Sequence, residues 1–117
     1  MKRGEIWTAS GGADYASKPR PVVIIQDDVF DGTGSVTICP LTTDPTEAPL
    51  FRLAIEPKDR NGLKSASRIM VDKVTTVPKS KLGERVGRIE DEDIVRLNQA
   101  LMVFLGLAVT PKSGSRS

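Results

Sequence analysis

A change in hydrophobic period near residue 90 constrains the fold of this chain more than any other feature of the sequence. Before it, short apolar stretches are separated by turn residues, as in a sheet of short strands. After it, residues 90–106 carry acids in a first helical turn and apolar residues at helical spacing, and Gly106 supplies a stop. The pattern predicts a mainly β (α+β) chain, with a small, strongly bent antiparallel sheet or partly open barrel and one C-terminal helix. The strands are expected at 4–9, 21–26, 35–42, 51–56, 67–77 and 81–89.

Two of these strands carry information about their position in the sheet. The aliphatic run in residues 21–26 predicts a central strand with both faces covered. Pro40 lies inside the strand expected at 35–42 and has no backbone N–H. We therefore expect that strand to lie at an edge of the sheet or to carry a bulge at Pro40.

The length and composition are those of one compact domain. The chain has 117 residues, of which 38% are hydrophobic and 27% are charged, and its net charge of +2 neither requires nor excludes nucleic acid. We expect one domain over 1–109 and a disordered tail over 110–117.

Metal and membrane sites are not expected. The chain has no histidine and a single cysteine, Cys39, which is interpreted as a core residue; neither a disulfide nor a metal or cofactor site is expected. No apolar run approaches the ~20 residues of a membrane span, and no signal peptide is recognisable, so a cytoplasmic protein is expected.

Arg20 is the strongest single candidate for a functional residue. It lies between Pro19 and Pro21, whose rings fix their own φ and extend the residue before them. An immobilised planar guanidinium suits bidentate contact with a phosphate group. The alternative is an ordinary surface arginine in a turn.

A second candidate is a threonine at the end of the strand expected at 35–42. A hydroxyl there can donate to a phosphoryl oxygen, although Thr43 with Asp44 can also simply open a turn. Strand alternation places Thr42 on the same side as Ile38 and Thr43 on the other. Only one of the two threonines can therefore face a pocket that Arg20 lines.

A third candidate lies on the strand expected at 67–77. Alternation places Arg68, Met70 and Asp72 on one face and leaves the intervening residues for the core. This face is either an ordinary solvated surface with a charge pair or part of a functional cluster.

The order of these motifs resembles one toxin family. "KRGEIW", "KPRPVVIIQ", "CPLTTDP" and "SRIMVDKVTTV", followed by the amphipathic helix, resemble the MazF/PemK/Kid toxins of type II toxin–antitoxin systems over about residues 2–107. The resemblance implies a small SH3-like barrel (PemK/CcdB-like) assembled as a homodimer. It also implies a metal-independent, sequence-specific endoribonuclease that cuts single-stranded RNA and is silenced by a cognate antitoxin.

The resemblance also assigns roles to individual residues. It implies that Arg20, Thr42 and Asp72 are catalytic, although Met70 stands where some members have an arginine, and Arg68 is a candidate to compensate. The expected RNA contacts are Tyr15, Lys18, Thr43, Ser67 and Arg68, and Tyr15 is either a stacking platform for a base or a turn residue without a ligand.

The implied chemistry fits the residue inventory. The 2′-hydroxyl of RNA attacks the adjacent phosphate and leaves a 2′,3′-cyclic phosphate and a 5′-hydroxyl, so the protein has only to align the groups and stabilise charge. Arg20 suits that task and is a candidate to protonate the leaving oxygen, but it is a poor base because a guanidinium stays protonated in proteins. Asp72 is the best-placed carboxylate, and the identity of the base stays open.

Three alternatives remain at this point. The first is a CcdB-like toxin that binds DNA gyrase without cutting RNA, although such toxins rely on the end of the helix, which here runs into 110–117. The second is an SH3-like RNA- or peptide-binding module, which the 4% aromatic content disfavours. The third is an inactive homologue that titrates antitoxin.

Overall fold

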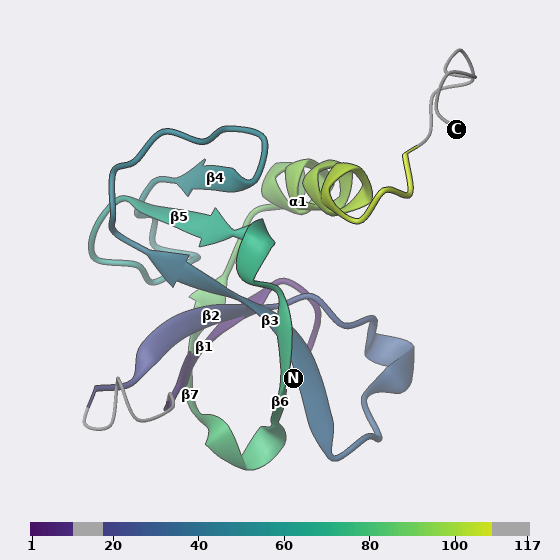
Figure 1. The fold of residues 1–117 in the computed structure, drawn as a ribbon. Helices are drawn as coiled ribbons and strands as arrows, with labels where there is room; N and C mark the ends of the chain where they lie inside the picture. The colour runs from purple at the N-terminus through teal and green to yellow at the C-terminus, as the bar shows by residue number, and fades with distance from the viewer. Residues whose placement is uncertain (11–17, 109–117) are drawn as a thin grey trace.

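The computed structural model describes residues 1–10 and 18–108. In this part of the chain, seven strands form one antiparallel sheet, and a single α-helix follows them (Figure 1). The strands are β1 (Glu5–Ala9), β2 (Arg20–Ile24), β3 (Ser35–Thr42), β4 (Arg52–Ile55), β5 (Ser67–Met70), β6 (Thr75–Pro78) and β7 (Leu82–Arg88), and the helix is α1 (Asp91–Phe104). Three short 3-10 turns, η2 (Asp28–Phe30), η3 (Val71–Lys73) and η4 (Lys79–Lys81), connect them.

The long strand β3 organises the sheet. The strand order is β4-β5-β3-β2-β1-β7, and β6 pairs with β3 outside this path. Residues 35–38 of β3 pair with β6, whereas residues 41–42 pair with β5. Because β3 changes its partner midway, the sheet curls, and β4 and β5 lie apart from β1, β2 and β7 (Figure 1). The predicted strongly bent antiparallel sheet is confirmed.

Pro40 corrects the expectation of an edge strand or a bulge. β3 is central, and Pro40 pairs in regular register with Val22 of β2. The carbonyl of Thr37 accepts from Ile25 on the β2 side, so alternation turns Pro40 to the opposite side. There it falls between Ile38, the last partner of β6, and Leu41, the first partner of β5. The missing N–H therefore costs no ladder bond.

The segment 67–77 corrects a second expectation, because it is not one strand. β5 ends at Met70, η3 turns the chain over Val71–Lys73, and β6 begins at Thr75. Val71 is fully buried, and its N–H donates to the carbonyl of Phe51 at 2.9 Å. The turn removes Asp72 from the strand face that Arg68 and Met70 share.

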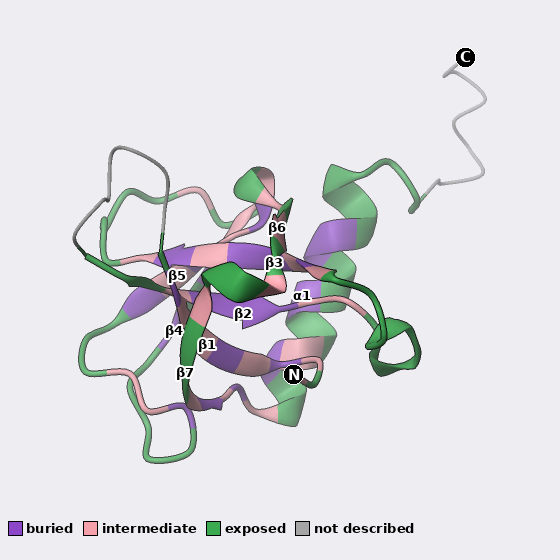
Figure 2. Cartoon of the chain, turned by 90° about the horizontal axis from the view of Figure 1, so that it is seen from below, coloured by how far each residue is buried: buried purple, intermediate pink, exposed green. Residues whose placement is uncertain are grey.

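The core lies on both faces of the central strands (Figure 2). Val23 of β2 belongs to the larger cluster, between the sheet and α1, while Val22 and Ile24 belong to a smaller cluster on the other face. The prediction that this strand is covered on both faces is confirmed. Cys39 is buried in the larger cluster, and burial raises the pKa of its thiol to about 12, so it stays protonated.

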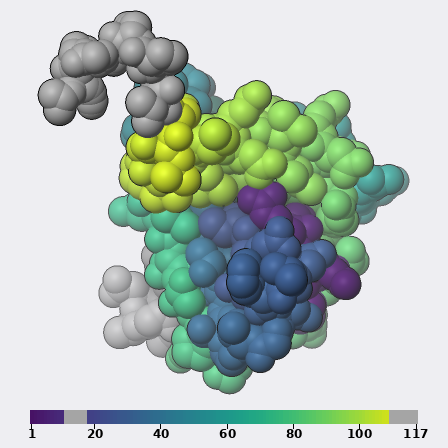
Figure 3. Space-filling view, turned by 90° about the vertical axis from the view of Figure 1, so that its right-hand side faces the viewer, coloured from purple at the N-terminus to yellow at the C-terminus, as the bar shows by residue number. Residues whose placement is uncertain are grey.

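Helix α1 covers the sheet with only part of its apolar stripe. Leu97 and Leu101 are buried against the core, whereas Phe104 and Leu105 are exposed. Figure 3 shows this end of α1, in yellow, on the molecular surface. Gly106 ends the helix with a φ of 75°, as predicted. In the described part of the chain no helix has the length and apolar character needed to cross a membrane.

Candidate active site

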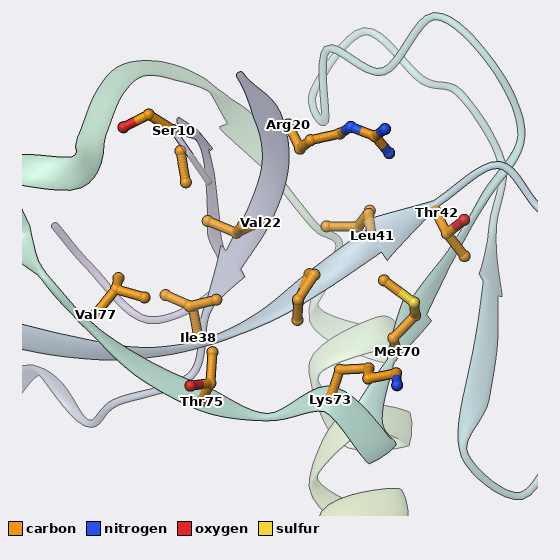
Figure 4. A pocket seen from close by; sticks show the side chains of 12 residues that line it. Ser10, Arg20, Val22, Ile38, Leu41, Thr42, Met70, Lys73, Thr75 and Val77 are labelled. Atoms are coloured by element: carbon orange, nitrogen blue, oxygen red, sulfur yellow. The ribbon is translucent and has the colours of Figure 1, made fainter. Parts of the chain in front are cut away.

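A cleft of about 420 Å³ opens on the concave side of the sheet, between β2, β3 and β6 (Figure 4). Its floor is apolar and its polar groups lie along the rim, which is the arrangement of many ligand sites. The lining residues are Ala9, Ser10, Arg20, Val22, Ile38, Pro40, Leu41, Thr42, Met70, Lys73, Thr75 and Val77.

Arg20 reaches the cleft from the first position of β2. Its backbone pairs with Ala9 of β1, and Pro19 and Pro21 on either side restrict its conformation. In Figure 4 its side chain extends toward the end of the cleft where Thr42 lies. A cation is therefore held on the sheet itself rather than on a flexible loop.

Thr42 reaches the same cleft from the last position of β3. It lines the cleft together with Ile38 and Pro40, as strand alternation predicts, whereas Thr43 is exposed and is not a lining residue. The Thr42 hydroxyl accepts a hydrogen bond from the N–H of Asp44 at 3.1 Å. A hydroxyl that accepts one bond can still donate one, so Thr42 can offer a donor to a ligand.

Lys73 is a site residue that sequence reasoning missed. Continuous alternation over 67–77 would place it on the core side of the strand, opposite Met70. Instead η3 turns the chain after Met70, and both residues line the cleft. Among the lining residues within 1–10 and 18–108, Arg20 and Lys73 are cationic and none is acidic, so this part of the cleft suits an anionic ligand. The sequence could have predicted that Lys73 faces the cleft only if the end of the strand at Met70 had been recognised.

Asp72 does not line the cleft. Its two carboxylate oxygens accept hydrogen bonds from Nε and Nη2 of Arg52, at 2.8 and 3.0 Å, and both side chains are partly buried. The hydrogen bonds from Arg52 hold the pKa of Asp72 below its usual range and raise that of Arg52. The carboxylate expected on the face of Arg68 is thus engaged elsewhere.

The remaining predicted contacts occupy different environments. Ser67 is buried and donates its hydroxyl to the carbonyl of Ser65, so it has no access to a ligand. Arg68 lies opposite Thr42 across the β3–β5 pair, but its guanidinium bonds to Glu47 at 2.9 Å and supports the loop after β3. Lys18 is exposed just before β2. Tyr15 lies outside the described residues.

In the residues that the structure describes, no cluster of three or more His, Cys, Asp or Glu side chains could bind a metal ion.

Comparison with known proteins identifies the family. Residues 2–105 match the family model described as the PemK-like, MazF-like toxin of type II toxin-antitoxin systems. The chain belongs to this toxin family. The resemblance inferred from the sequence motifs is thereby confirmed.

Curated relatives of this PemK/MazF-like chain are endoribonucleases. The probable endoribonuclease MazF of Mycolicibacterium smegmatis is 56% identical over 108 residues, which cover 92% of this chain and 99% of the relative. The endoribonuclease EndoA of Bacillus subtilis is 26% identical over 113 residues, which cover 92% and 96%. The predicted endoribonuclease class is confirmed, and the gyrase-binding alternative is not supported.

Solved structures share the fold of this PemK/MazF-like toxin. An endoribonuclease from a mycobacterial species, solved in complex with its cognate antitoxin, superposes with a TM-score of 0.78 at 23% identity and covers 94% of this chain and 99% of its own. The Mycobacterium tuberculosis toxin MazF-mt6 gives a TM-score of 0.75 at 24% identity, with 90% and 99% covered. The predicted mainly β fold with one C-terminal helix is confirmed.

Proposed function

We propose that this toxin cuts single-stranded RNA at short sequence motifs in the cleft between β2, β3 and β6, without a metal ion. The observation that carries the proposal is that Arg20 and Thr42, which come from different strands, line one cleft. A fixed cation and a hydroxyl donor at one site are the groups needed to stabilise negative charge on a phosphoryl group in the transition state. Membership of the family and the endoribonuclease relatives support the same reaction.

Arg20 and Thr42 both stabilise the transferred phosphoryl group, one through its charge and the other through a hydrogen bond. As the 2′-hydroxyl attacks, negative charge builds on the non-bridging oxygens, and the guanidinium of Arg20 can meet two of them at once. The hydroxyl of Thr42 donates to the same phosphoryl group. The 2′-oxygen releases its proton to solvent as it bonds to phosphorus, and the bond from phosphorus to the 5′-oxygen breaks. The 5′-oxygen takes up a proton from solvent, so the products are a 2′,3′-cyclic phosphate and a 5′-hydroxyl.

The other lining residues bind the RNA around the cut. Lys73 offers a point charge to a neighbouring phosphate, since an ammonium group binds phosphate without fixed geometry. The apolar floor, which includes Val22, Ile38 and Met70, can seat the face of an unstacked base. Because none of the described residues that line the cleft carries a carboxylate or an imidazole, these residues act through position and charge rather than as a strong general base.

Two protein partners complete the proposal. A cognate antitoxin would silence the toxin, in line with the family description and with the similar endoribonuclease that was solved with its own antitoxin. A second copy would form a homodimer, which the exposed apolar side chains at the end of α1 support because a monomer leaves them in water. A toxin that attacks cellular RNA would act in the cytoplasm.

Digestion of a long defined RNA by the purified toxin, with EDTA present, tests the proposed function. The expected result is a set of cuts at one short motif, with 2′,3′-cyclic phosphate and 5′-hydroxyl ends. Intact RNA together with inhibition of gyrase would favour the CcdB-like alternative. A requirement for added Mg²⁺ would overturn the metal-independent mechanism, and cuts within duplex RNA would overturn the choice of substrate.

A further inference from the structure

The ion pair between Arg52 and Asp72 joins the start of β4 to η3, immediately beside the cleft. It is a two-point contact, with Nε–Oδ1 and Nη2–Oδ2 distances of 2.8 and 3.0 Å. The side chains are only 17% and 21% exposed, so solvent screens the pair less than it screens a surface ion pair. A bidentate guanidinium–carboxylate contact fixes orientation as well as distance.

The ion pair contacts η3, and the chain at η3 supplies two of the residues that line the cleft. Asp72 is the middle residue of η3; Met70, which precedes the turn, and Lys73, its last residue, both line the cleft. Arg52 is also the strand partner of Met70 across the β4–β5 pair. Its backbone therefore pairs with the end of β5, and its side chain binds the turn that follows. A 3-10 turn of this length has little stability of its own, so its direction is set by contacts with the rest of the fold: the buried Val71, the bond from its N–H to Phe51, and the ion pair of Asp72.

We propose that the Arg52–Asp72 pair is a positioning device for the cleft, which fixes η3 so that Lys73 and Met70 face the RNA. This inference rests on the proposed function, because it assigns a role in placing the substrate. Asp72 is thereby a positioning residue that acts through Lys73 and Met70. It is not a catalytic residue that touches the reacting atoms.

The environment of Asp72 argues against a direct catalytic role. Each of its oxygens accepts a hydrogen bond from Arg52, and neither Asp72 nor Arg52 lines the cleft. The hydrogen bonds from Arg52 also lower the pKa of Asp72, which weakens it as a proton acceptor near neutral pH. A general base must reach the 2′-hydroxyl, and this carboxylate is directed at β4 instead.

A double-mutant cycle on RNA cleavage separates the two roles. We expect Asp72→Asn and Arg52→Met each to lower kcat/KM by about 10–100-fold, mainly through KM, because displaced binding groups weaken the hold on substrate. The double variant should be no worse than the more damaged single variant, since the two residues form one unit. Arg52→Lys should recover part of the loss. A collapse of kcat in Asp72→Asn, with Arg52→Met near wild type, would overturn the proposal.

Hydrogen exchange on the full chain gives a readout that does not depend on RNA. The N–H of Val71 donates to Phe51 and that of Val74 to Val71, so both amides report on η3. We expect both to exchange at least about tenfold faster in Asp72→Asn while the rest of the sheet stays protected. Unchanged exchange at both amides, in a toxin that does cut RNA, would overturn the positioning role and leave the proposed function standing. A wild-type protein that cuts no RNA would overturn the proposed function and the role in placing RNA with it, whatever the exchange result.

The matched control is Arg85→Met. It removes another strand-borne arginine ion pair, from Nε of Arg85 to Glu5 at 3.0 Å, in a place that does not line the cleft. Its kcat/KM should stay at the wild-type value. An equal loss in Arg85→Met would show that any such ion pair supports activity through stability, and would overturn the specific role of Arg52 and Asp72.

Discussion

Thr42 and Thr43 offer a comparison at the scale of single residues, because two identical side chains follow each other and only one lines the cleft. If the hydroxyl of Thr42 donates to the phosphoryl group in the transition state, Thr42→Ala should lower kcat by about 10²–10³-fold. Thr43→Ala should cut RNA at close to the wild-type rate. Single-turnover cleavage of one short RNA measures both variants, and the reverse order of damage would place the wrong threonine at the site.

The ion pair between Asp72 and Arg52 should make the free energy of unfolding depend on pH. Its pKa is lowered in the folded state, so it stabilises the fold above its unfolded value near ~3.9 and loses this contribution as pH falls through the folded value. The gap in unfolding free energy between wild type and Asp72→Asn should therefore be constant at neutral pH and narrow below about pH 4. Urea unfolding at pH 7 and pH 3 measures it, and a gap of equal size at both pH values would contradict the pairing.

Local sequence predicted some site residues and not others. Arg20 and Thr42 could be predicted because prolines and strand alternation act within a few residues of each position. Asp72 and Lys73 could not, because their directions depend on an ion pair with Arg52, which lies far away in the sequence. The alternation of apolar side chains runs through Val71 whether or not the strand continues. This alternation therefore gives no sign of the turn at η3.

At the scale of secondary structure, β3 creates the cleft by pairing with β6 first and with β5 afterwards. Its bounds matched the expected 35–42, since turn residues flank it on both sides. Its place in the sheet did not match the expectation. A proline without an N–H fits an edge strand or a bulge, and it also fits a point in a central strand where no partner needs that N–H. Only the tertiary structure distinguishes these cases. Here the proline lies at a change of partner, not at an edge.

Gly87 tests the packing of β7 against the loop that precedes β5. A Cβ at this position would come within 2.4 Å of the backbone of Asn61, a buried residue that has no room to move away. We expect Gly87→Ala to destabilise the fold by roughly 1–3 kcal/mol or more. Gly34→Ala, where a Cβ meets nothing within 4 Å, should be neutral or slightly stabilising. Equal unfolding midpoints in denaturant for the two variants would contradict this packing.

At the scale of the whole molecule, the distribution of charge matters more than its total. The net charge is only +2, yet the described residues that line the cleft include two cations and no acid. Attraction of RNA should therefore depend on these positions, and it should weaken with salt as phosphate contacts displace counterions.

Lys73→Met tests that electrostatic contribution, because methionine keeps much of the aliphatic stem and removes the charge. The slope of log affinity against log salt for a single-stranded RNA should fall in magnitude by about 0.7, the value for one phosphate contact. The same change at Lys58, which does not line the cleft, should leave the slope unaltered. A loss confined to RNAs with one particular base would instead assign Lys73 to base recognition.

The central claim is that a guanidinium and a hydroxyl in one cleft stabilise the phosphate while the RNA cuts itself. Cleavage of a defined single-stranded RNA by Arg20→Ala, with EDTA present and with unfolding followed on the same sample, tests it most directly. The account predicts a rate at least about 10³-fold below wild type in a variant that is still folded at the assay temperature. Cutting at near the wild-type rate by the folded variant would contradict it.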